Sequence, residues 1–218
     1  MKRILWVLAL ALVLFSACKK KQPTGFSEPL VVGYWVCTES DCNGTKTYNP
    51  PLYVRASKDH KIRFYEGSYE HGWYWELKGD KLIVTSGTDC PEITLKSLDN
   101  IHLSWEKDWF GEHYVESYTK IGALLPGNWR VTHNGIGYTV IIKADDIDSG
   151  TAIWKKNDAG SMLSYNWSMS SGERHGLYFQ TQASTDDLPT AFSVPFNSVS
   201  DNIIKGELNT YEIVFERQ

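Results

Sequence analysis

Catalytic signatures are absent from this sequence of 218 residues. It contains no Gly-x-Ser-x-Gly nucleophile elbow, no His-Glu-x-x-His zinc motif and no glycine-rich phosphate loop. Its six histidines are scattered, and the Cys/His spacing does not fit a metal site. The sequence therefore indicates a protein that is not an enzyme and that uses no cofactor and no metal. We expect the histidines to be solvated surface residues.

The sequence also lacks long apolar runs, apart from one at its start. Lys2 and Arg3 precede the apolar run Ile4–Ala17, which is too short for the roughly 20 residues of a membrane-spanning helix. A positive start followed by such a run is typical of a secretory signal peptide, here residues 1–17. The closing letters Leu-Phe-Ser-Ala-Cys resemble the lipobox of bacterial lipoproteins. That resemblance implies cleavage before Cys18 and lipidation of its sulfur and new amino group.

A lipidated Cys18 implies attachment to a membrane, because two or more acyl chains anchor a protein stably. Residues 18–29 contain prolines and a glycine and are interpreted as a tether. Lys19–Lys21 would favour anionic headgroups. These lysines differ from the acidic residues that resemble surface-export signals in Bacteroidetes. We therefore expect a cell-envelope protein on the outer membrane that faces the periplasm.

An excess of basic residues is missing as well. The net charge is −4, and loss of residues 1–17 removes two positive charges and no acidic residue, which gives −6. A mildly acidic exported protein is not expected to bind nucleic acid.

No segment after the signal shows a sustained helical period, whereas alternation of apolar and polar residues is frequent. Turn signals separate the alternating runs at spacings of about 8–12 residues, which favours antiparallel strands in a sandwich or barrel. The acidic stretch Asp145–Gly150 faintly resembles a calcium loop but lacks its distal glutamate, so we interpret it as a hairpin turn. The mature chain is therefore predicted to be all-β.

The mature chain contains two similar halves. Gly33-Tyr34-Trp35 opens one half and Gly127-Asn128-Trp129 opens the other, 94 residues later. Near the ends of the halves, Asp99–Ile101 matches Asp201–Ile203. We predict two domains, residues 30–121 and 122–218, with equivalent and buried tryptophans at their starts.

The two Gly-x-Trp motifs, each followed by a meander of short aromatic-rich strands, resemble the lipocalin superfamily. More narrowly, the chain resembles the tandem lipocalin-like domains of about ninety residues in Bacteroidetes lipoproteins. The resemblance covers nearly all of the mature chain. It implies two small antiparallel meander barrels or sandwiches. An eight-stranded barrel is only just wide enough to be filled by side chains or to hold one small ligand.

Three cysteines remain besides the lipidated one, so at most one intramolecular disulfide is expected. Cys37 shares a strand face with Trp35, and its counterpart in the second half is Val131, which favours a small buried residue. Cys42 and Cys90 lie in turn-like segments. A Cys42–Cys90 disulfide is favoured over a Cys37–Cys90 pair and over no bridge.

The chain is rich in aromatic residues, with nine tryptophans and twelve tyrosines. Most of them are expected in the core, but strand parity or loop placement directs Tyr34, Tyr74, Trp109 and Phe110 outward. Exposed aromatics stack on sugars or anchor protein contacts, so these four are candidate ligand-binding residues. The loop 107–111 either presents a contact surface or folds back to plug the first barrel.

Two hypotheses about function follow. The first is a non-enzymatic, membrane-anchored binding module for a small apolar or carbohydrate ligand. The second is an envelope protein for protein–protein interaction or assembly, with packed barrels and no ligand pocket. A pocket of about 300 Å³ or more with apolar walls would favour the first.

Overall fold

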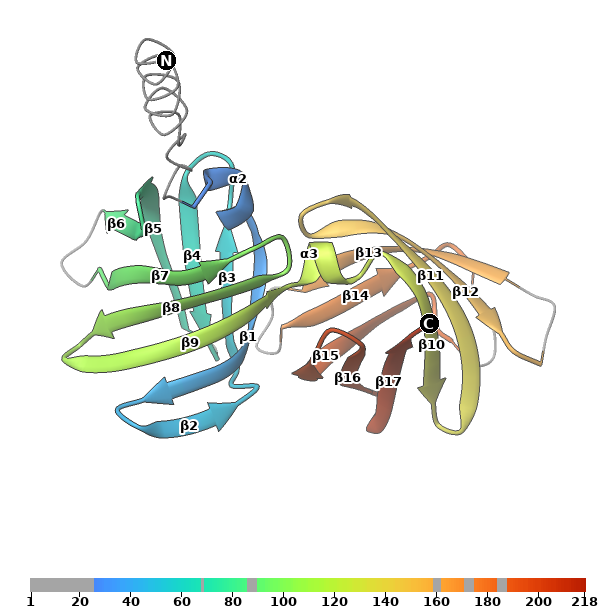
Figure 1. Cartoon of the computed structure of the whole chain (residues 1–218). Coiled ribbons are helices and arrows are strands. Elements are labelled where there is room, and N and C mark those ends of the chain that lie inside the picture. The colour runs from blue at the N-terminus through green and yellow to red at the C-terminus, as the bar shows by residue number, and fades with distance from the viewer. Residues whose placement is uncertain (1–25, 68, 86–89, 159–161, 171–174, 184–187) are drawn as a thin grey trace, which may run out of the picture.

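A computed structural model describes residues 26–67, 69–85, 90–158, 162–170, 175–183 and 188–218. The predicted signal peptide, Cys18 and most of the tether lie outside these residues. The fold is all-β, with two closed eight-stranded antiparallel barrels in tandem, as predicted (Figure 1). Within the described ranges, no helix is long and apolar enough to cross a bilayer.

Barrel 1 is a meander that follows the short helix α2 (Glu28–Val31). Its strands are β1 (Gly33–Cys42), β2 (Thr45–Tyr48), β3 (Leu52–Ala56), β4 (Lys61–Glu66), β5 (Tyr69–Lys78), β6 (Lys81–Thr85), β7 (Glu92–Leu98), β8 (His102–Trp109) and β9 (Glu112–Lys120). The long strand β1 pairs with both β3 and β9, which closes the barrel, while β2 adds an extra edge strand to β1.

Barrel 2 follows directly through the short helix α3 (Ile121–Leu124). Its strands are β10 (Gly127–His133), β11 (Ile136–Asp146), β12 (Ser149–Lys156), β13 (Met162–Ser170), β14 (Gly176–Gln180), β15 (Ala191–Val199), β16 (Ile203–Leu208) and β17 (Tyr211–Arg217). Pairing of β10 with β17 closes this barrel. The acidic stretch predicted as a hairpin forms the β11–β12 connection.

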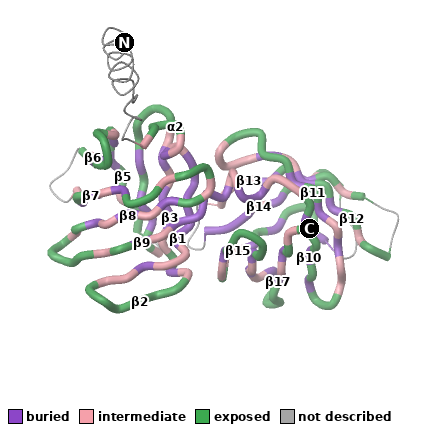
Figure 2. The backbone as a smooth tube through the Cα atoms, in the orientation of Figure 1, coloured by how far each residue is buried: buried purple, intermediate pink, exposed green. Residues whose placement is uncertain are grey.

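Alternation along the strands places one face of each sheet inside its barrel. In β5, Trp73 and Trp75 are buried while the intervening Tyr74 is exposed, and β13 buries Tyr165 and Trp167 in the same way. Figure 2 shows this as buried segments that recur on strands of both barrels. Because successive side chains on a strand point to opposite faces, alternation is the sequence feature that specifies the barrel interior.

Four two-residue turns place a residue other than glycine in left-handed backbone at their first position. Three of them begin with asparagine, at Asn43-Gly44, Asn134-Gly135 and Asn209-Thr210. The fourth is Phe110-Gly111, with φ of 51° at Phe110. Type I′ turns favour Asn-Gly because both central residues have positive φ, so phenylalanine is the unusual choice here.

The Gly-x-Trp motif of barrel 1 holds α2 against the start of β1. The indole nitrogen of Trp35 donates to the Val31 carbonyl at 2.8 Å, and Lys120 Nζ donates to the Leu30 carbonyl at 2.6 Å. The ammonium of Lys120 also lies 4.6 Å from the centre of the Trp35 ring. A Cβ on Gly33 would lie 2.8 Å from the Lys120 side chain, so the glycine makes room for the lysine to cross.

Barrel 2 repeats this arrangement with an arginine. Trp129 donates to the Leu125 carbonyl at 2.7 Å, Arg217 donates to the Leu124 carbonyl, and its guanidinium lies 4.7 Å from the Trp129 ring centre. A Cβ on Gly127 would lie 3.2 Å from the same guanidinium. The predicted equivalence of the two tryptophans is confirmed, since both are 0 % exposed.

Each barrel interior holds a cluster of buried hydrophobic side chains. Barrel 2 has an aromatic core in which Trp154 contacts Tyr165, Phe179, Phe192 and Phe215 edge to face. Such arrangements add about 0.5–1.5 kcal/mol per pair beyond area burial. The centre of the barrel 2 core is therefore a cluster of aromatic rings around Trp154.

Barrel 1 encloses an ion pair. Lys107 Nζ lies 3.0 Å from Glu116 Oε1, and both side chains are almost completely buried. The other carboxylate oxygen of Glu116 accepts hydrogen bonds from Trp105 at 2.7 Å and Tyr118 at 2.8 Å. Burial and the neighbouring Glu116 raise the pKa of Tyr118, which keeps its hydroxyl protonated as a donor. A buried carboxylate is tolerated because its acceptors are satisfied.

The two barrels share an apolar interface. Tyr34, Val36, Tyr53 and Tyr65 lie on the outer face of barrel 1 and belong to the same buried cluster as the core of barrel 2. The ring of His175, from barrel 2, lies 4.2 Å from that of Tyr53 and 4.6 Å from that of Tyr65. The barrels are therefore packed together rather than linked loosely.

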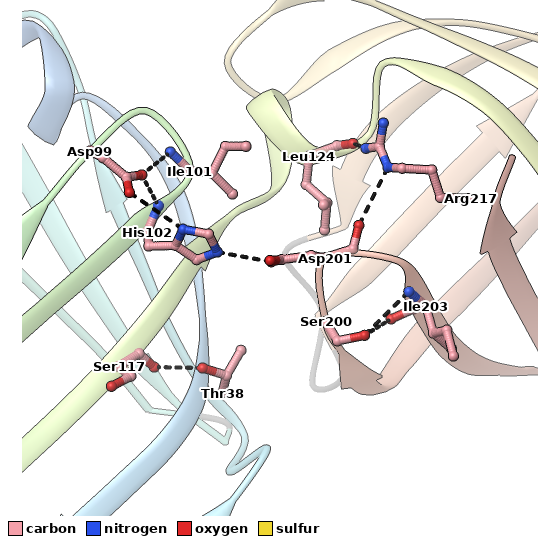
Figure 3. Close-up of polar contacts among 10 residues, drawn as sticks. All are labelled: Thr38, Asp99, Ile101, His102, Ser117, Leu124, Ser200, Asp201, Ile203 and Arg217. Atoms are coloured by element: carbon pink, nitrogen blue, oxygen red, sulfur yellow. Dashed lines mark hydrogen bonds and ion pairs between the residues drawn. The ribbon is translucent and has the colours of Figure 1, made fainter.

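A polar contact joins the barrels beside this interface. His102 Nε2 of barrel 1 lies 2.8 Å from Asp201 Oδ1 of barrel 2 (Figure 3). Within barrel 1, Asp99 accepts hydrogen bonds from the backbone N–H groups of Ile101 and His102. Asp99 and Asp201 belong to the matching turns of the two halves. The same turn from each repeat thus meets at one histidine.

Candidate ligand-binding site

A pocket of about 330 Å³ lies where barrel 2 contacts the α2 end of barrel 1. We call it the seam pocket. It is lined by residues from α2 and the following link, the β3–β4 turn, β5 and the β11–β12 connection, namely Glu28, Pro29, Val32, Lys58, His60, Trp75 and Ile147. Its size and apolar walls fall in the range of small-molecule sites.

Trp75 and His60 form an aromatic wall of the seam pocket. Their ring centres are 5.1 Å apart and the planes are tilted by 34°. His60 Nδ1 lies 3.2 Å from the Trp75 carbonyl, and the Trp75 backbone N–H donates to the His60 carbonyl at 2.8 Å. These bonds hold the turn and the strand together, so the wall is rigid. The indole N–H of Trp75 is buried without a hydrogen-bond partner among the described residues.

Two charged side chains complete the lining. Glu28 and Lys58 are both exposed, and neither forms an ion pair with another described residue. The apolar walls fit the body of a small molecule, and the two charges are available to its polar group. Specificity in such pockets comes from a few polar groups within apolar walls.

Barrel 2 supplies one wall through Ile147. Arg55 on β3 pairs with Asp148 at 2.8 Å, which brings the β11–β12 connection onto barrel 1. A Cβ on Gly122 of α3 would lie 2.5 Å from the Ile147 carbonyl, so only glycine permits this close approach. Ile147 and Val32 also line a second pocket of about 380 Å³ on the other side.

The sequence does not predict most of these residues as a site. It places Pro29 in the tether, Trp75 in the core and Asp145–Gly150 in a turn. In the structure, β11 runs to Asp146, four residues past its last pair with β10, and thus extends its hairpin beyond the barrel. No sequence pattern shows that this hairpin reaches the other domain.

The predicted exposure of Tyr34 is wrong. Its side chain points out of barrel 1, as parity predicted, but barrel 2 covers that face and leaves it 3 % exposed. Its hydroxyl forms a hydrogen bond with Nδ1 of His175. The expectation of a solvated His175 is wrong for the same reason, because this ring is 2 % exposed and burial lowers its pKa. Tyr74, by contrast, is 52 % exposed, as expected.

The two aromatics of loop 107–111 adopt different positions. Trp109 folds back against barrel 1, with its ring centre 5.1 Å from that of His71 and 6.0 Å from that of Trp73. Phe110 stacks on Trp109 at 5.1 Å but stays 71 % exposed. Phe110 therefore remains a candidate contact residue, while Trp109 forms part of the barrel packing. Their ligand-binding role stays a prediction.

The favoured Cys42–Cys90 disulfide does not fit the fold, because the two residues lie far apart in barrel 1. Cys42 lies on β1, whereas Cys90 precedes β7, and the strands β9 and β8 lie between them. Three strand spacings of about 4.8 Å separate the two strands by roughly 14 Å, twice the Cα distance that a disulfide spans. Cys37 is buried, as predicted, and burial raises its pKa.

The described residues contain no group of three or more His, Cys, Asp or Glu side chains that could hold a metal ion. Comparison of the chain with protein-family models, curated proteins and solved structures finds no match. The tandem barrels are consistent with lipocalin-like domains.

Proposed function

We propose that the chain is a non-enzymatic lipoprotein of the cell envelope, of the Bacteroidetes type, and that it binds a small amphiphilic ligand in the seam pocket. The observation that carries this proposal is the pocket of about 330 Å³ between the barrels, walled by Trp75, Val32 and Ile147. Lipid on Cys18 would attach the protein to the outer membrane on its periplasmic side.

The class of ligand follows from the lining. Apolar walls favour an apolar body, and burial of that body contributes about 25 cal/mol per Å². The charged groups of Lys58 and Glu28 favour a polar or ionic group at the rim. Packed side chains fill much of both barrel interiors, which favours the seam over the interiors as the binding place.

The proposed anchor supports an amphiphile rather than a fully soluble ligand. Glu28 lies ten residues after Cys18. An extended chain of that length spans at most about 35 Å, so the pocket stays close to the membrane surface. An amphiphile that leaves the bilayer therefore has only a short distance to travel to the pocket.

The test uses the fluorescent amphiphile 1-anilinonaphthalene-8-sulfonate with the mature protein. Ile147→Asp places a carboxylate in the apolar wall and should weaken binding at least about tenfold, which corresponds to 1.4 kcal/mol. Ile141→Asp is the matched control, because Ile141 lies on β11, the strand that leads to Ile147, is 41 % exposed and does not line the pocket. Absence of probe binding to the wild type, or equal binding by all three proteins, would contradict the proposal.

A second candidate is an envelope protein that binds other proteins through barrel 1. The observation that favours it is Phe110, which is 71 % exposed and occupies a left-handed position where the other three turns of this kind have asparagine. Unfavourable backbone conformations often persist where function requires them. Exposed aromatic anchors are frequent in protein interfaces.

A further inference from the structure

The β11–β12 hairpin belongs to barrel 2 but completes a pocket whose other residues come from barrel 1. Ile147 at its tip is the single residue of barrel 2 that lines the seam pocket, within the described part of the chain. In Figure 1 the connection between β11 and β12 lies beside α3, on the side of barrel 2 that faces barrel 1. The pocket is therefore a composite of two domains.

The hairpin tip is held by a small number of contacts. Asp148, next to Ile147, pairs with Arg55 at 2.8 Å, and their side chains are 24 % and 40 % exposed. The Asp148 carbonyl accepts a hydrogen bond from the Met169 backbone at 2.8 Å, within barrel 2. The ion pair is thus the charged contact that ties the tip to β3 of barrel 1, next to the turn that carries Lys58.

We propose that the β11–β12 hairpin is a movable wall of the seam pocket and that the Arg55–Asp148 ion pair is its latch. This inference rests on the proposed function. A ligand in the pocket contacts Ile147 only when the hairpin is docked, so it binds the latched state more tightly. By linkage, ligand binding and latching stabilise each other to the same extent.

The partial exposure of the Arg55–Asp148 ion pair suits its role as a latch. An ion pair at this level of exposure contributes modestly, and salt screens it. Such a latch can open without unfolding either barrel, because the last four residues of β11, which lead to the tip, are exposed and lie outside the core. Ligand affinity should therefore decrease with ionic strength even for a ligand without charge.

The experiment is a charge swap read by the same fluorescent probe. Arg55→Glu sets two carboxylates against each other and should weaken binding about fivefold or more. The double variant Arg55→Glu, Asp148→Arg restores the opposite charges and should recover most of the affinity. Lys96→Glu is the matched control, because Lys96 pairs with Glu106 at 2.7 Å with similar exposure, on β7 and β8 of the same barrel.

The outcomes distinguish failure of the proposed latch from failure of the proposed binding site. If Ile147→Asp weakens binding while Arg55→Glu leaves it unchanged, the latch is overturned and the site stands. If the wild type does not bind the probe, the proposed function fails first. Should Arg55→Glu unfold, Arg55→Gln replaces it, and an affinity equal to wild type in this folded variant overturns the latch. Failure of the double variant to recover binding also counts against it.

Discussion

Phe110 is a bulky residue in a strained backbone conformation. With φ of 51°, it occupies the position where Asn43, Asn134 and Asn209 serve the equivalent turns. A bulky residue in the left-handed region costs roughly 1–2 kcal/mol, whereas asparagine tolerates it better. Phe110 stacks on Trp109, but its ring stays 71 % exposed, so little burial offsets that cost.

Phe110→Asn should therefore stabilise the protein by about 0.5–1 kcal/mol, measured by urea unfolding. The reciprocal change Asn134→Phe should destabilise it by a similar amount. If Phe110 anchors a protein partner, the stabilised variant will bind that partner more weakly. A loss of stability in Phe110→Asn would show that stacking on Trp109 outweighs the strain.

His102 gives the inter-barrel contact a pH dependence. Asp201 and Asp99 raise its pKa, the first through the hydrogen bond between the barrels. A raised pKa means that the contribution is complete below about pH 6.5, the unfolded value, and is lost as pH rises through the folded pKa. Thermal unfolding followed across this range should show the loss in wild type and its absence in His102→Gln. A wild-type curve that parallels the variant at every pH would refute this role.

At the scale of elements, both barrels begin with the same arrangement, which we call the closing motif. It consists of the glycine and tryptophan of Gly-x-Trp and a cation from the last strand of the barrel. Lys120 provides the cation in barrel 1 and Arg217 in barrel 2. Burial lowers the pKa of Lys120 to about 8, whereas arginine stays charged.

Lys120→Arg should preserve stability, because the second barrel already uses arginine at this place. Lys120→Met keeps the length of the side chain but removes the hydrogen bond to Leu30 and the contact of the cation with the ring. We expect a loss of about 1–3 kcal/mol in the free energy of unfolding, measured by urea denaturation. Equal stability of the two variants would show that the lysine acts only through its apolar stem.

Strands and barrels could be predicted from the sequence because alternation and turn chemistry are local. Trp73, Trp75, Tyr165 and Trp167 follow that alternation, and all are buried as expected. The seam pocket could not be predicted, because it depends on how two domains pack. The alternation of side chains along β1 predicts that Tyr34 points outward. It does not predict that barrel 2 covers this side chain. The cation of the closing motif was in principle detectable, since it ends the last strand of each half.

For the whole molecule, the interface between the barrels determines how they unfold. Tyr53 on the outer face of barrel 1 is 5 % exposed and stacks on His175 of barrel 2. Tyr53→Ala should cost about 3 kcal/mol and separate one melting transition into two, seen by calorimetry. Tyr74→Ala is the control from the same barrel and should cost less than about 0.5 kcal/mol. Two transitions in the wild type would show that the barrels unfold independently.

Closure of β1 on β9 also has a consequence for the folding of the newly made chain. The backbone of Cys37 on β1 is the sheet partner of Tyr118 on β9. Barrel 1 therefore cannot close until nearly its whole sequence is available. Contacts of such long sequence separation form slowly, in milliseconds to seconds. Because barrel 1 emerges first, Tyr34, Val36, Tyr53 and Tyr65 stay uncovered until barrel 2 folds. During that interval the chain has an apolar patch that is prone to aggregation and is a natural target for a chaperone.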